Sequence, residues 1–421
     1  MPRIIAPGDL DLSAYIRPGD AVIWGQLTAE PFTLTEAVNA QCSELGGIKA
    51  FVGMSVRESL DPECAEHIEF TFSGGAVTNH RFARKSALNT LPVHLSRVPG
   101  HIEAGDIPCD VALIQAAPDE GIGTLNLALS ADYMGAAVAK ARTVIAEVNV
   151  RLPHTRGNTG IPLDRIDAIV PTDRPPATIE PPPIGDAERT IGDHIARLVP
   201  DRATIQMGIG AIPDAALEAL VRKRDLGVHT GLLTEKVVDL IEAGALTNRC
   251  KEIDEGICVA AILYGTERLY RWAHQNDKLA MRSADSTGGA VTLANFHRLV
   301  AINSAVEVDL TGQINGEVAA SRPVGQVGGQ VDYGRGALLS PGGRGIIALR
   351  STARKGTVST IVPSLSAGVV TTARTDADTI VTEYGIAELA GVPVATRARR
   401  LVAIAHPDFR DALTEAAERV C

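Results

Sequence analysis

The segment ATIQMGIGAIPDAALEALVRKR, residues 203–224, decides the fold class. Its first eight residues, 203–210, form an apolar run that ends in glycine, which predicts a buried strand followed by a tight turn. In residues 212–224 the apolar positions recur with the helical period, and Pro213 suits the first turn of a helix. Strand, glycine turn and helix in this order predict an α/β fold with a mostly parallel sheet.

The same alternation continues on both sides of this segment. Short β-branched runs predict strands, and longer stretches with apolar residues at helical spacing predict helices. The predicted strands are 20–25, 110–117, 143–149, 226–231, 345–351 and 378–383, and the predicted helices are 31–45, 131–142, 234–244 and, interrupted at Pro407, 398–421. We therefore expect two open α/β domains.

A proline-rich segment, 151–185, separates the two halves of the chain. It holds eight prolines, too many for a regular helix or strand, because proline lacks a backbone N–H and fixes φ. We predict that this segment is the linker at the end of an N-terminal domain, 1–185. The C-terminal domain is then predicted to span 186–421.

The composition is that of an ordinary globular protein. Of the 421 residues, 45% are hydrophobic and 21% are charged, and the net charge of −10 is spread without long blocks of one sign. Nucleic acid is therefore not an expected partner. No apolar run reaches the roughly 20 residues needed to cross a membrane. The first residues also lack the apolar region of a signal peptide, so we predict a cytoplasmic protein without membrane contact.

The six cysteines are scattered without a CxxC pair, which argues against a zinc site or a disulfide framework and predicts reduced thiols. They are Cys42, Cys64, Cys109, Cys250, Cys258 and Cys421. The motifs GxSxG, HExxH, GxxxxGK[ST] and SxxK are absent from the sequence. Serine hydrolases, zinc proteases and P-loop nucleotidases thus lose their main sequence support, and we predict no metal site.

The first glycine motif follows the strand 203–210. It consists of Gly208, Ile209, Gly210, Ala211 and Ile212. Glycines between a strand and a helix let backbone N–H groups approach a phosphate or a carbonyl, and the helix N-terminus adds a favourable dipole. A purely structural turn is the alternative. A dinucleotide fingerprint is disfavoured, because proline replaces its third glycine.

The second glycine motif is GQVGGQVDYGRG, residues 325–336, with five glycines in twelve residues. Such a segment is predicted to be a flexible loop that contributes little core and costs roughly 1 kcal/mol or more per residue to order. A bound ligand would offset that cost. The alternative is a surface loop without a function.

These motifs recur in a wider pattern that resembles a known family. Residues 206–217 and 226–244, together with INSAVEVDLTGQINGE (302–317), residues 325–349 and TIVTEYGIAEL (379–389), resemble the acetyl-CoA hydrolase/transferase family. That family includes 4-hydroxybutyrate and succinate CoA-transferases. The resemblance covers essentially the whole chain and is strongest over 204–410. It implies two related α/β domains of CoA-transferase type that face each other across a cleft holding an acyl-CoA.

The resemblance also implies roles for individual residues. The loop from Gly208 to Ile212 would bind CoA. Gly328 and Gly329 would bring main-chain N–H groups close to the thioester, with Gln330 and Asp332 fixing the loop, and such groups are suited to form an oxyanion hole. Lys355 would approach the CoA phosphates, where a mobile point charge suffices. The alternatives for that position are Arg350, Arg354, or no ligand role at all.

One family residue is missing. The family has His-Thr-Glu or His-Ser-Glu where this chain has His229, Thr230 and Gly231, and that glutamate is the family's covalent nucleophile. The resemblance therefore places Gly231 at the nucleophile position without a side chain. Deleting a catalytic nucleophile commonly costs on the order of 10⁴-fold or more in rate. Gly231 has no side chain, so the ping-pong mechanism through an enzyme-bound CoA thioester cannot use this residue.

Three replacements for the nucleophile are open. Glu235 lies four residues on, about one helical turn or roughly 6 Å away if the segment is helical. Glu307 and Glu317 flank the DLTGQ turn, although a structural pairing is favoured for Glu307, as it is for Glu383 in VTEYG. The third replacement is direct attack by water or a carboxylate on a thioester polarised by the glycine loops.

We therefore predict an acyl-CoA:carboxylate CoA-transferase that moves CoA between small carboxylic acids, with a place in acetate metabolism. The alternatives are an acyl-CoA hydrolase without a glutamyl-CoA intermediate and a CoA-binding protein without turnover. A nicotinamide dehydrogenase ranks last. The expected ligands are an acyl-CoA, as substrate rather than bound cofactor, and a small carboxylate. Whether the protein is a homo-oligomer is left open.

Overall fold

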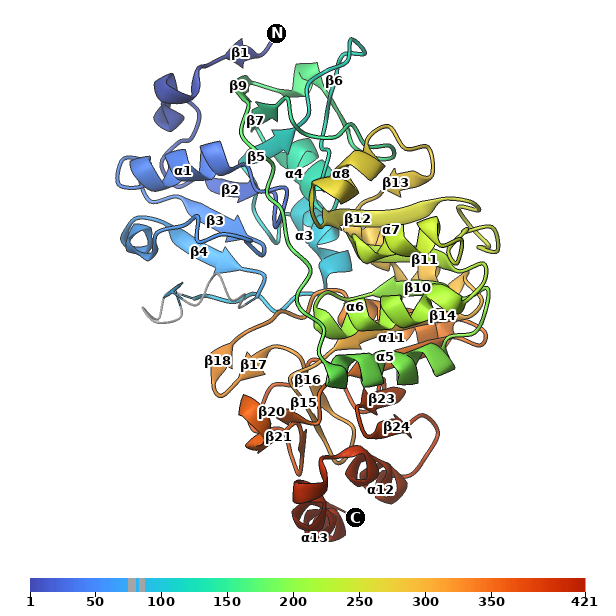
Figure 1. Ribbon diagram of the computed structural model, residues 1–421. Helices are drawn as coiled ribbons and strands as arrows, with labels where there is room; N and C mark the ends of the chain where they lie inside the picture. Colours follow the sequence, from blue (N-terminus) through green and yellow to red (C-terminus); the bar gives the residue numbers. More distant parts are fainter. Residues whose placement is uncertain (75–80, 83–87, 421) are drawn as a thin grey trace. The chain divides into compact units, whose positions relative to one another are not determined.

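The structure is a computed structural model that describes residues 1–74, 81–82 and 88–420 (Figure 1). The chain divides into two compact units. The first contains Met1–Glu180 and Val259–Thr287, and the second contains Pro181–Cys258 and Gly288–Cys421. The segment Val259–Thr287 falls in the predicted C-terminal domain, 186–421, whereas its contacts place it in the first unit.

A parallel sheet of seven strands forms the centre of the first unit, in the order β1-β9-β7-β5-β2-β3-β4. The predicted strands 20–25, 110–117 and 143–149 are confirmed and are neighbours within it. Alternate residues of these strands enter two apolar clusters, one on each face, as parallel sheets require. The strands are β1 (Arg3–Ile4), β2 (Ala21–Trp24), β3 (Lys49–Val52), β4 (Glu69–Phe72), β5 (Val111–Ala116), β7 (Thr143–Asn149) and β9 (Ala168–Thr172).

Helices and shorter strands complete this unit. The described helices include α1 (Phe32–Gln41), α3 (Val98–Ala104), α4 (Met134–Lys140) and α8 (Glu267–Ala273). Further strands include β6 (Thr124–Asn126), β8 (Gly160–Pro162), β13 (Leu279–Met281) and β12 (Cys258–Tyr264), of which all but Cys258 belongs to this unit. The predicted helices 31–45 and 131–142 are therefore confirmed with shorter bounds.

The prediction that 151–185 holds no regular element is wrong. Strand β9, inside this range, pairs along its length with β7 and includes Pro171. Proline is tolerated there because β1 pairs only with Ala168 and Ile169, so Pro171 lies beyond the end of that neighbour. The longest stretch of this range without helix or strand is 173–185.

The second unit contains strands in the order β11-β10-β14-β19-β23-β24, parallel except for the last pair. They are β10 (Thr204–Met207), β11 (Gly227–Thr234), β14 (Leu299–Ser304), β19 (Arg344–Ala348), β23 (Thr379–Thr382) and β24 (Gly385–Glu388). Four of them are the predicted strands 203–210, 226–231, 345–351 and 378–383. Strand β11 continues three residues beyond its predicted end, which matters for the site described below.

The helices of the second unit lie against this sheet. In Figure 1, α5 (Asp186–Leu198), α6 (Ala211–Ala219) and α7 (Lys236–Glu242) lie side by side, and α11 (Gln330–Leu339) packs on β14 and β19. Helix α10 (Ala290–Ala294) packs on α11. The predicted terminal helical region forms α12 (Val394–Ile404) and α13 (Arg410–Val420), with a short 3₁₀ turn at Pro407–Phe409 as the predicted interruption.

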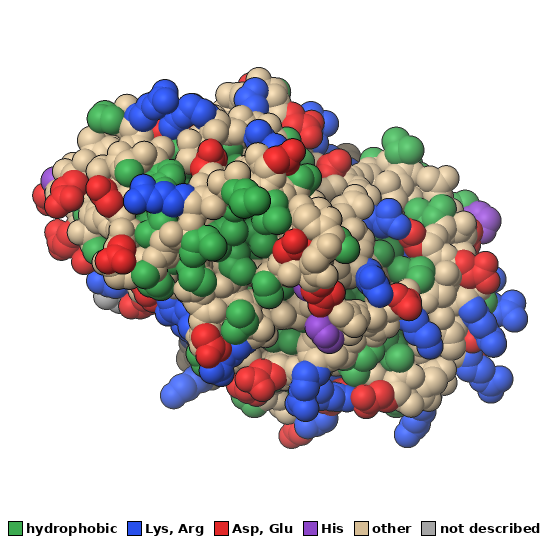
Figure 2. All heavy atoms as spheres, turned by 90° about the horizontal axis from the view of Figure 1, so that it is seen from above, with side chains coloured by type: hydrophobic (Ala, Val, Ile, Leu, Met, Phe, Trp, Pro, Cys, Tyr) green, Lys and Arg blue, Asp and Glu red, His purple; other side chains and the backbone are tan. Residues whose placement is uncertain are grey.

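Three further properties of the described residues concern membrane spanning, cysteine pairing and surface charge. Within the described residues, every helix is too short or too polar to span a membrane. No disulfide joins the five cysteines that the structure describes, and Cys421 lies outside the described residues. On the face shown in Figure 2, Lys and Arg side chains are interspersed with Asp and Glu.

Candidate active site

Two of the predicted site glycines are level with each other at the carboxyl edge of the second unit's sheet. Strand β10 pairs with β11 so that Thr204 is opposite Gly227. Continuing this register places Met207 beside Thr230, whose Oγ1 lies 3.5 Å from the Met207 nitrogen. Gly208 is then beside Gly231. Ligands bind at this edge in open α/β sheets.

The loop from Gly208 to Ile212 joins β10 to α6. A Cβ on Gly208 would lie 3.1 Å from Asn303 Oδ1, so the turn is close to the end of β14. Gly210 precedes the first residue of α6 and has a φ of 116°, which disfavours any residue with a side chain. The predicted loop therefore presents the N-terminus of a nine-residue helix, the end that attracts anions.

Gly231 is not required by the backbone. It is buried and keeps the extended conformation of β11, which any residue adopts. A Cβ at this position would lie 3.4 Å from the Tyr333 hydroxyl oxygen and 3.7 Å from the nearest ring carbon. These are ordinary contact distances, so a Cβ would fit. Glycine here leaves the space in front of the Tyr333 hydroxyl without a side chain from β11.

The second glycine motif also meets Tyr333. Gly329 immediately precedes α11, and a Cβ on it would lie 2.9 Å from a ring carbon of Tyr333. The Tyr333 nitrogen donates to the Gly329 carbonyl at 3.0 Å. Gln330 Nε2 donates to Thr372 Oγ1 at 3.0 Å, which ties the first turn of the helix to another segment.

The prediction that 325–336 is a flexible loop is wrong for its second half. Residues from Gln330 onward form α11, although glycine usually destabilises a helix. The structure shows why a glycine is needed at one of these positions. A Cβ on Gly336 would lie 2.5 Å from the Leu293 side chain, so the small residue permits α10 and α11 to pack closely.

The predicted phosphate-binding cation lies on a surface turn. Lys355 is exposed between the short strands β20 (Thr352–Ala353) and β21 (Val358–Ser359), with a φ of 58°. Of its alternatives, Arg350 forms an ion pair with the buried Glu188 and is therefore engaged in the fold. Arg354 is exposed beside Lys355. A contact between CoA and Lys355 stays a prediction.

The proposed proximity of Glu235 to Gly231 does not hold. The prediction took the intervening residues as one helical turn, about 6 Å. In the structure β11 extends to Thr234, and a strand rises about 3.3 Å per residue, so Glu235 lies about 13 Å along the chain direction from Gly231. Glu235 instead precedes α7, where an acidic group favours the helix.

The other candidate carboxylates are engaged in the fold. Glu307 accepts hydrogen bonds from Asn315 Nδ2 at 3.1 Å and from Ser366, which confirms the structural pairing favoured for it. Glu317 accepts from Thr371 Oγ1 at 2.7 Å. Glu383 accepts from the Ser351 nitrogen at 2.8 Å and its hydroxyl at 2.6 Å, again as predicted.

Sequence reasoning missed Tyr333. It lies within the second glycine motif, is 3% exposed, and is the side chain that a Cβ on either Gly231 or Gly329 would meet. The helical spacing from Gly329 to Tyr333 could have indicated that the two share a face. Its meeting with Gly231, about a hundred residues earlier, had no signal in the sequence.

A buried polar cluster at the carboxyl edge of the first unit's sheet was also missed. Glu30 is 1% exposed and accepts hydrogen bonds from the hydroxyls of Ser55 and Ser59 and, at 3.2 Å, from Thr35. Burial raises the pKa of Glu30 to about 7, although these hydrogen bonds and Arg57 oppose the rise. The carboxyl is therefore poised to titrate near neutral pH.

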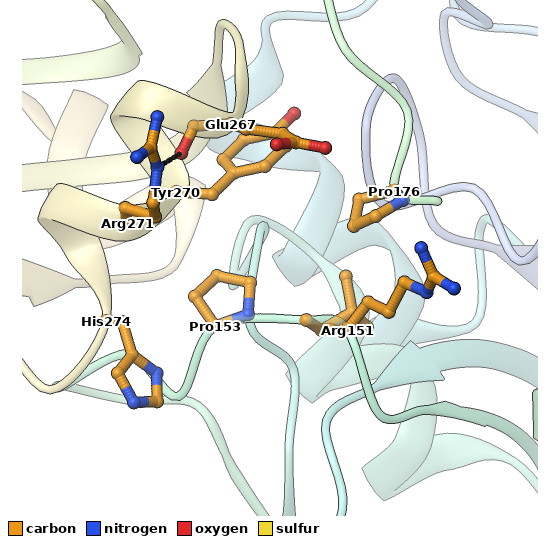
Figure 3. A pocket seen from close by; sticks show the side chains of 8 residues that line it. Arg151, Pro153, Pro176, Glu267, Tyr270, Arg271 and His274 are labelled. Carbon is orange, nitrogen blue, oxygen red and sulfur yellow. Dashed lines mark hydrogen bonds between the residues drawn. The ribbon is translucent and has the colours of Figure 1, made fainter. Parts of the chain in front are cut away.

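A pocket of about 340 Å³ opens in the first unit (Figure 3). It is lined by Arg151, Leu152, Pro153, Pro176, Glu267, Tyr270, Arg271 and His274. Several of its polar groups are already engaged. Arg151 pairs with Asp173, the Tyr270 hydroxyl donates to the Ala177 carbonyl, and His274 Nδ1 accepts from the His154 nitrogen at 3.0 Å. The predicted glycine loops, in contrast, belong to the second unit.

Comparison with known proteins identifies the family. Residues 11–180 match the acetyl-CoA hydrolase/transferase N-terminal domain and residues 265–417 match the C-terminal domain. The chain is also 38% identical to 4-hydroxybutyrate coenzyme A transferase of Clostridium kluyveri, over 93% of this chain and 92% of the relative. The chain belongs to the acetyl-CoA hydrolase/transferase family. It is an enzyme of that family.

Other similar proteins match over nearly the whole chain. Succinyl-CoA:cyclohexane-1-carboxylate CoA transferase of Geobacter metallireducens is 35% identical over 98% of this chain and 94% of the relative. The crystal structure of 4-hydroxybutyrate CoA-transferase from Porphyromonas gingivalis matches with a TM-score of 0.84 and 33% identity, covering 100% and 98% of the two chains. RipA from Yersinia pestis matches with a TM-score of 0.92 and 31% identity, covering 99% and 97%. The predicted CoA-transferase fold is confirmed.

Proposed function

We propose that this protein is an acyl-CoA:carboxylate CoA-transferase that moves CoA between small carboxylic acids. The observation that carries the proposal is the gathering of glycine stretches around Gly208, Gly231 and Gly329 in one unit, with the Tyr333 side chain facing the Cβ positions of Gly231 and Gly329. The transferase relatives named above support it. Acyl-CoA is the substrate and is not retained as a cofactor.

Each glycine stretch has a part in this proposal. Main-chain N–H groups of residues 208–212 at the start of α6 bind the CoA end of the substrate, since that helix end favours anions. Gly328, Gly329 and Gln330 lie against the thioester, and Lys355 approaches the CoA phosphates. Gly231 stands where the family has its nucleophile. The acceptor carboxylate then attacks the thioester directly.

A second candidate function is acyl-CoA hydrolysis. The absence of a side chain at Gly231 favours it, because water can then occupy the space that a nucleophilic carboxylate would fill. The two functions differ in what they release. A hydrolase liberates free CoA thiol without any acceptor, whereas a transferase converts one acyl-CoA into another and liberates none.

The first experiment measures ligand binding and turnover. Titration calorimetry with CoA, acetyl-CoA and NAD is expected to show saturable binding of the first two, because the dinucleotide fingerprint is broken at Pro213. Chromatography of reactions with acetyl-CoA and succinate, butyrate or 4-hydroxybutyrate then separates new acyl-CoA from free thiol. Saturable NAD binding with no CoA binding would reject the proposal. CoA binding with no turnover would support the alternative that the protein binds CoA without catalysing a reaction.

The second experiment tests the position assigned to Gly231. Incubation with acyl-CoA followed by borohydride or hydroxylamine and peptide mapping marks any carboxylate that carries CoA. We expect no marked residue in the wild type and a marked residue in Gly231→Glu, where a Cβ fits. Leu232→Glu is the control, since neighbouring strand residues point to opposite faces. A marked Glu235, Glu307 or Glu317 in the wild type would refute direct attack.

The remaining predictions concern the setting of the enzyme. A cytoplasmic location and a place in acetate metabolism rest on the sequence alone. Cell fractionation and growth on acetate of a deletion strain test them. Light scattering of the purified protein decides whether it forms a homo-oligomer.

A further inference from the structure

Tyr333 lies where the proposed reaction takes place. Its ring packs on the Gly329 backbone and its hydroxyl oxygen is 3.4 Å from the Cβ position of Gly231. The proposed function places Gly329 against the thioester and Gly231 at the position of the family's nucleophile. The phenol is 3% exposed, so bulk water does not compete strongly for a hydrogen bond with its hydroxyl.

The local structure holds this phenol in a fixed place. Tyr333 is in the first turn of α11, and its nitrogen donates to the Gly329 carbonyl at 3.0 Å. Gln330, in the same turn, is tied to Thr372. A Cβ on Gly329 would lie 2.9 Å from a ring carbon, so glycine is what allows the ring to lie this close to the main chain. A group held in this way needs little reorganisation during a reaction, which is what makes a donor effective.

A buried tyrosine hydroxyl is suited to one task in thioester chemistry. Phenol is a hydrogen-bond donor that stays protonated at neutral pH, and donors of this kind stabilise negative charge that develops on a carbonyl oxygen. It is a weak nucleophile in this state. Its chemistry therefore fits an oxyanion donor better than a covalent replacement for the absent glutamate.

We propose that Tyr333 is a catalytic residue whose hydroxyl donates a hydrogen bond to the thioester oxygen as the tetrahedral intermediate forms. This inference rests on the proposed function and adds a named group to it. The acceptor carboxylate oxygen attacks the thioester carbon, and the carbonyl π electrons move to the oxygen that Tyr333 binds. Collapse breaks the C–S bond and gives a mixed anhydride and CoA thiolate.

The second half of the transfer uses the same donor. The CoA thiolate attacks the acceptor-derived carbonyl of the anhydride, whose oxygen takes the place of the first oxyanion. Collapse releases the original acid as its carboxylate and leaves the new acyl-CoA. No proton or oxidant is consumed. With water in place of the carboxylate, attack gives the free acid and the water proton ends on the thiolate.

The test compares Tyr333→Phe with the wild type. Phenylalanine keeps the ring contact with Gly329 and removes only the hydroxyl, so the fold and CoA affinity by calorimetry are expected to stay within about threefold. Turnover is expected to fall by about 10²–10³-fold, the usual effect of losing one oxyanion donor. Tyr384→Phe is the matched control, because that ring is 40% exposed and packs on His406.

Infrared difference spectroscopy of bound [1-¹³C]acetyl-CoA gives a readout that a structural role would not move. A hydrogen bond from Tyr333 lowers the stretching frequency of the bound thioester carbonyl relative to free acetyl-CoA. Tyr333→Phe is expected to return the band toward its solution value, while Tyr384→Phe leaves it shifted. This measurement on the wild type and the control stands even where the Tyr333 variant folds poorly.

The outcomes separate the inference from the proposed function. Turnover of Tyr333→Phe within threefold of the wild type, or an unshifted band in the wild type, overturns the role of Tyr333 and leaves the transferase proposal intact. Loss of CoA binding together with turnover in Tyr333→Phe shows that the hydroxyl supports the fold or ligand binding, and also overturns the role. A wild type that binds CoA but acts on no acyl-CoA refutes the proposed function itself.

Discussion

Replacing Glu30 by glutamine should change how the stability of the first unit depends on pH. Glu30 is buried among the hydroxyls of Thr35, Ser55 and Ser59, and burial raises its pKa from 4.5 to about 7. The folded state therefore holds the proton more tightly than the unfolded chain does. Its stabilising contribution is complete below pH 4.5 and is lost as the pH rises through 7.

The size of the effect follows from the two pKa values. Each factor of ten in the ionisation constant corresponds to about 1.4 kcal/mol, so ionising Glu30 costs the folded state about 3 kcal/mol. Glutamine is neutral at every pH and keeps one acceptor for the hydroxyls. Between pH 5 and pH 8 the free energy of unfolding of the wild type should therefore fall by about 2.5 kcal/mol relative to Glu30→Gln.

Urea unfolding followed by tryptophan fluorescence measures this difference. Both tryptophans, Trp24 and Trp272, lie in the first unit, so their signal reports on that unit. Other carboxyls titrate alike in both proteins and cancel in the comparison. Glu36→Gln, on the exposed side of α1 and paired with Arg174, is the control and should behave like the wild type. Parallel pH profiles for wild type and Glu30→Gln would refute the argument.

Three further changes test other parts of the fold and site. Gly329→Val should abolish acyl-CoA turnover, because its Cβ collides with the ring of Tyr333; steady-state kinetics with an unchanged rate would place this motif outside the site. Gly157→Ala should lower stability by about 3 kcal/mol or more, since φ is 107° and a Cβ would meet the β13 main chain at 2.2 Å; a thermal melt within 2 °C of the wild type would contradict this. Arg350→Ala leaves the buried Glu188 carboxylate without its ion-pair partner and should cost about 1–2 kcal/mol at pH 7. Since the arginine lowers the pKa of Glu188, urea unfolding at pH 4 should show a smaller loss.

The sequence predicted best those strands and turns whose structure is determined by their own residues. The strands 143–149 and 110–117 are apolar runs buried on both faces, and such runs identify parallel strands without further information. The β10–α6 turn was equally visible, because Gly210 needs a positive φ. The family resemblance rested on these and similar local motifs.

Features that depend on packing or pairing with segments far away in the sequence were not predicted. Strand β9 contains a proline and is recognisable only from its pairing with β7 and the shortness of β1. Helix α11 has a glycine-rich sequence that is stabilised by close packing against Leu293. The space beside Gly231 is shaped by Tyr333, and this pair is joined only in the folded chain.

The membership of Val259–Thr287 in the first unit has a consequence for biosynthesis. As the chain leaves the ribosome, residues 1–180 emerge long before the segment that supplies the Ala261 carbonyl for the Ala131 nitrogen and the Met281 carbonyl for the Asn158 nitrogen. The nascent first unit therefore lacks these native hydrogen-bond partners until about a hundred more residues have been translated. Non-local closure of this kind slows folding. An isolated fragment ending at Glu180 would lack the same segment permanently, so a truncated gene would yield an incomplete unit rather than a small independent protein.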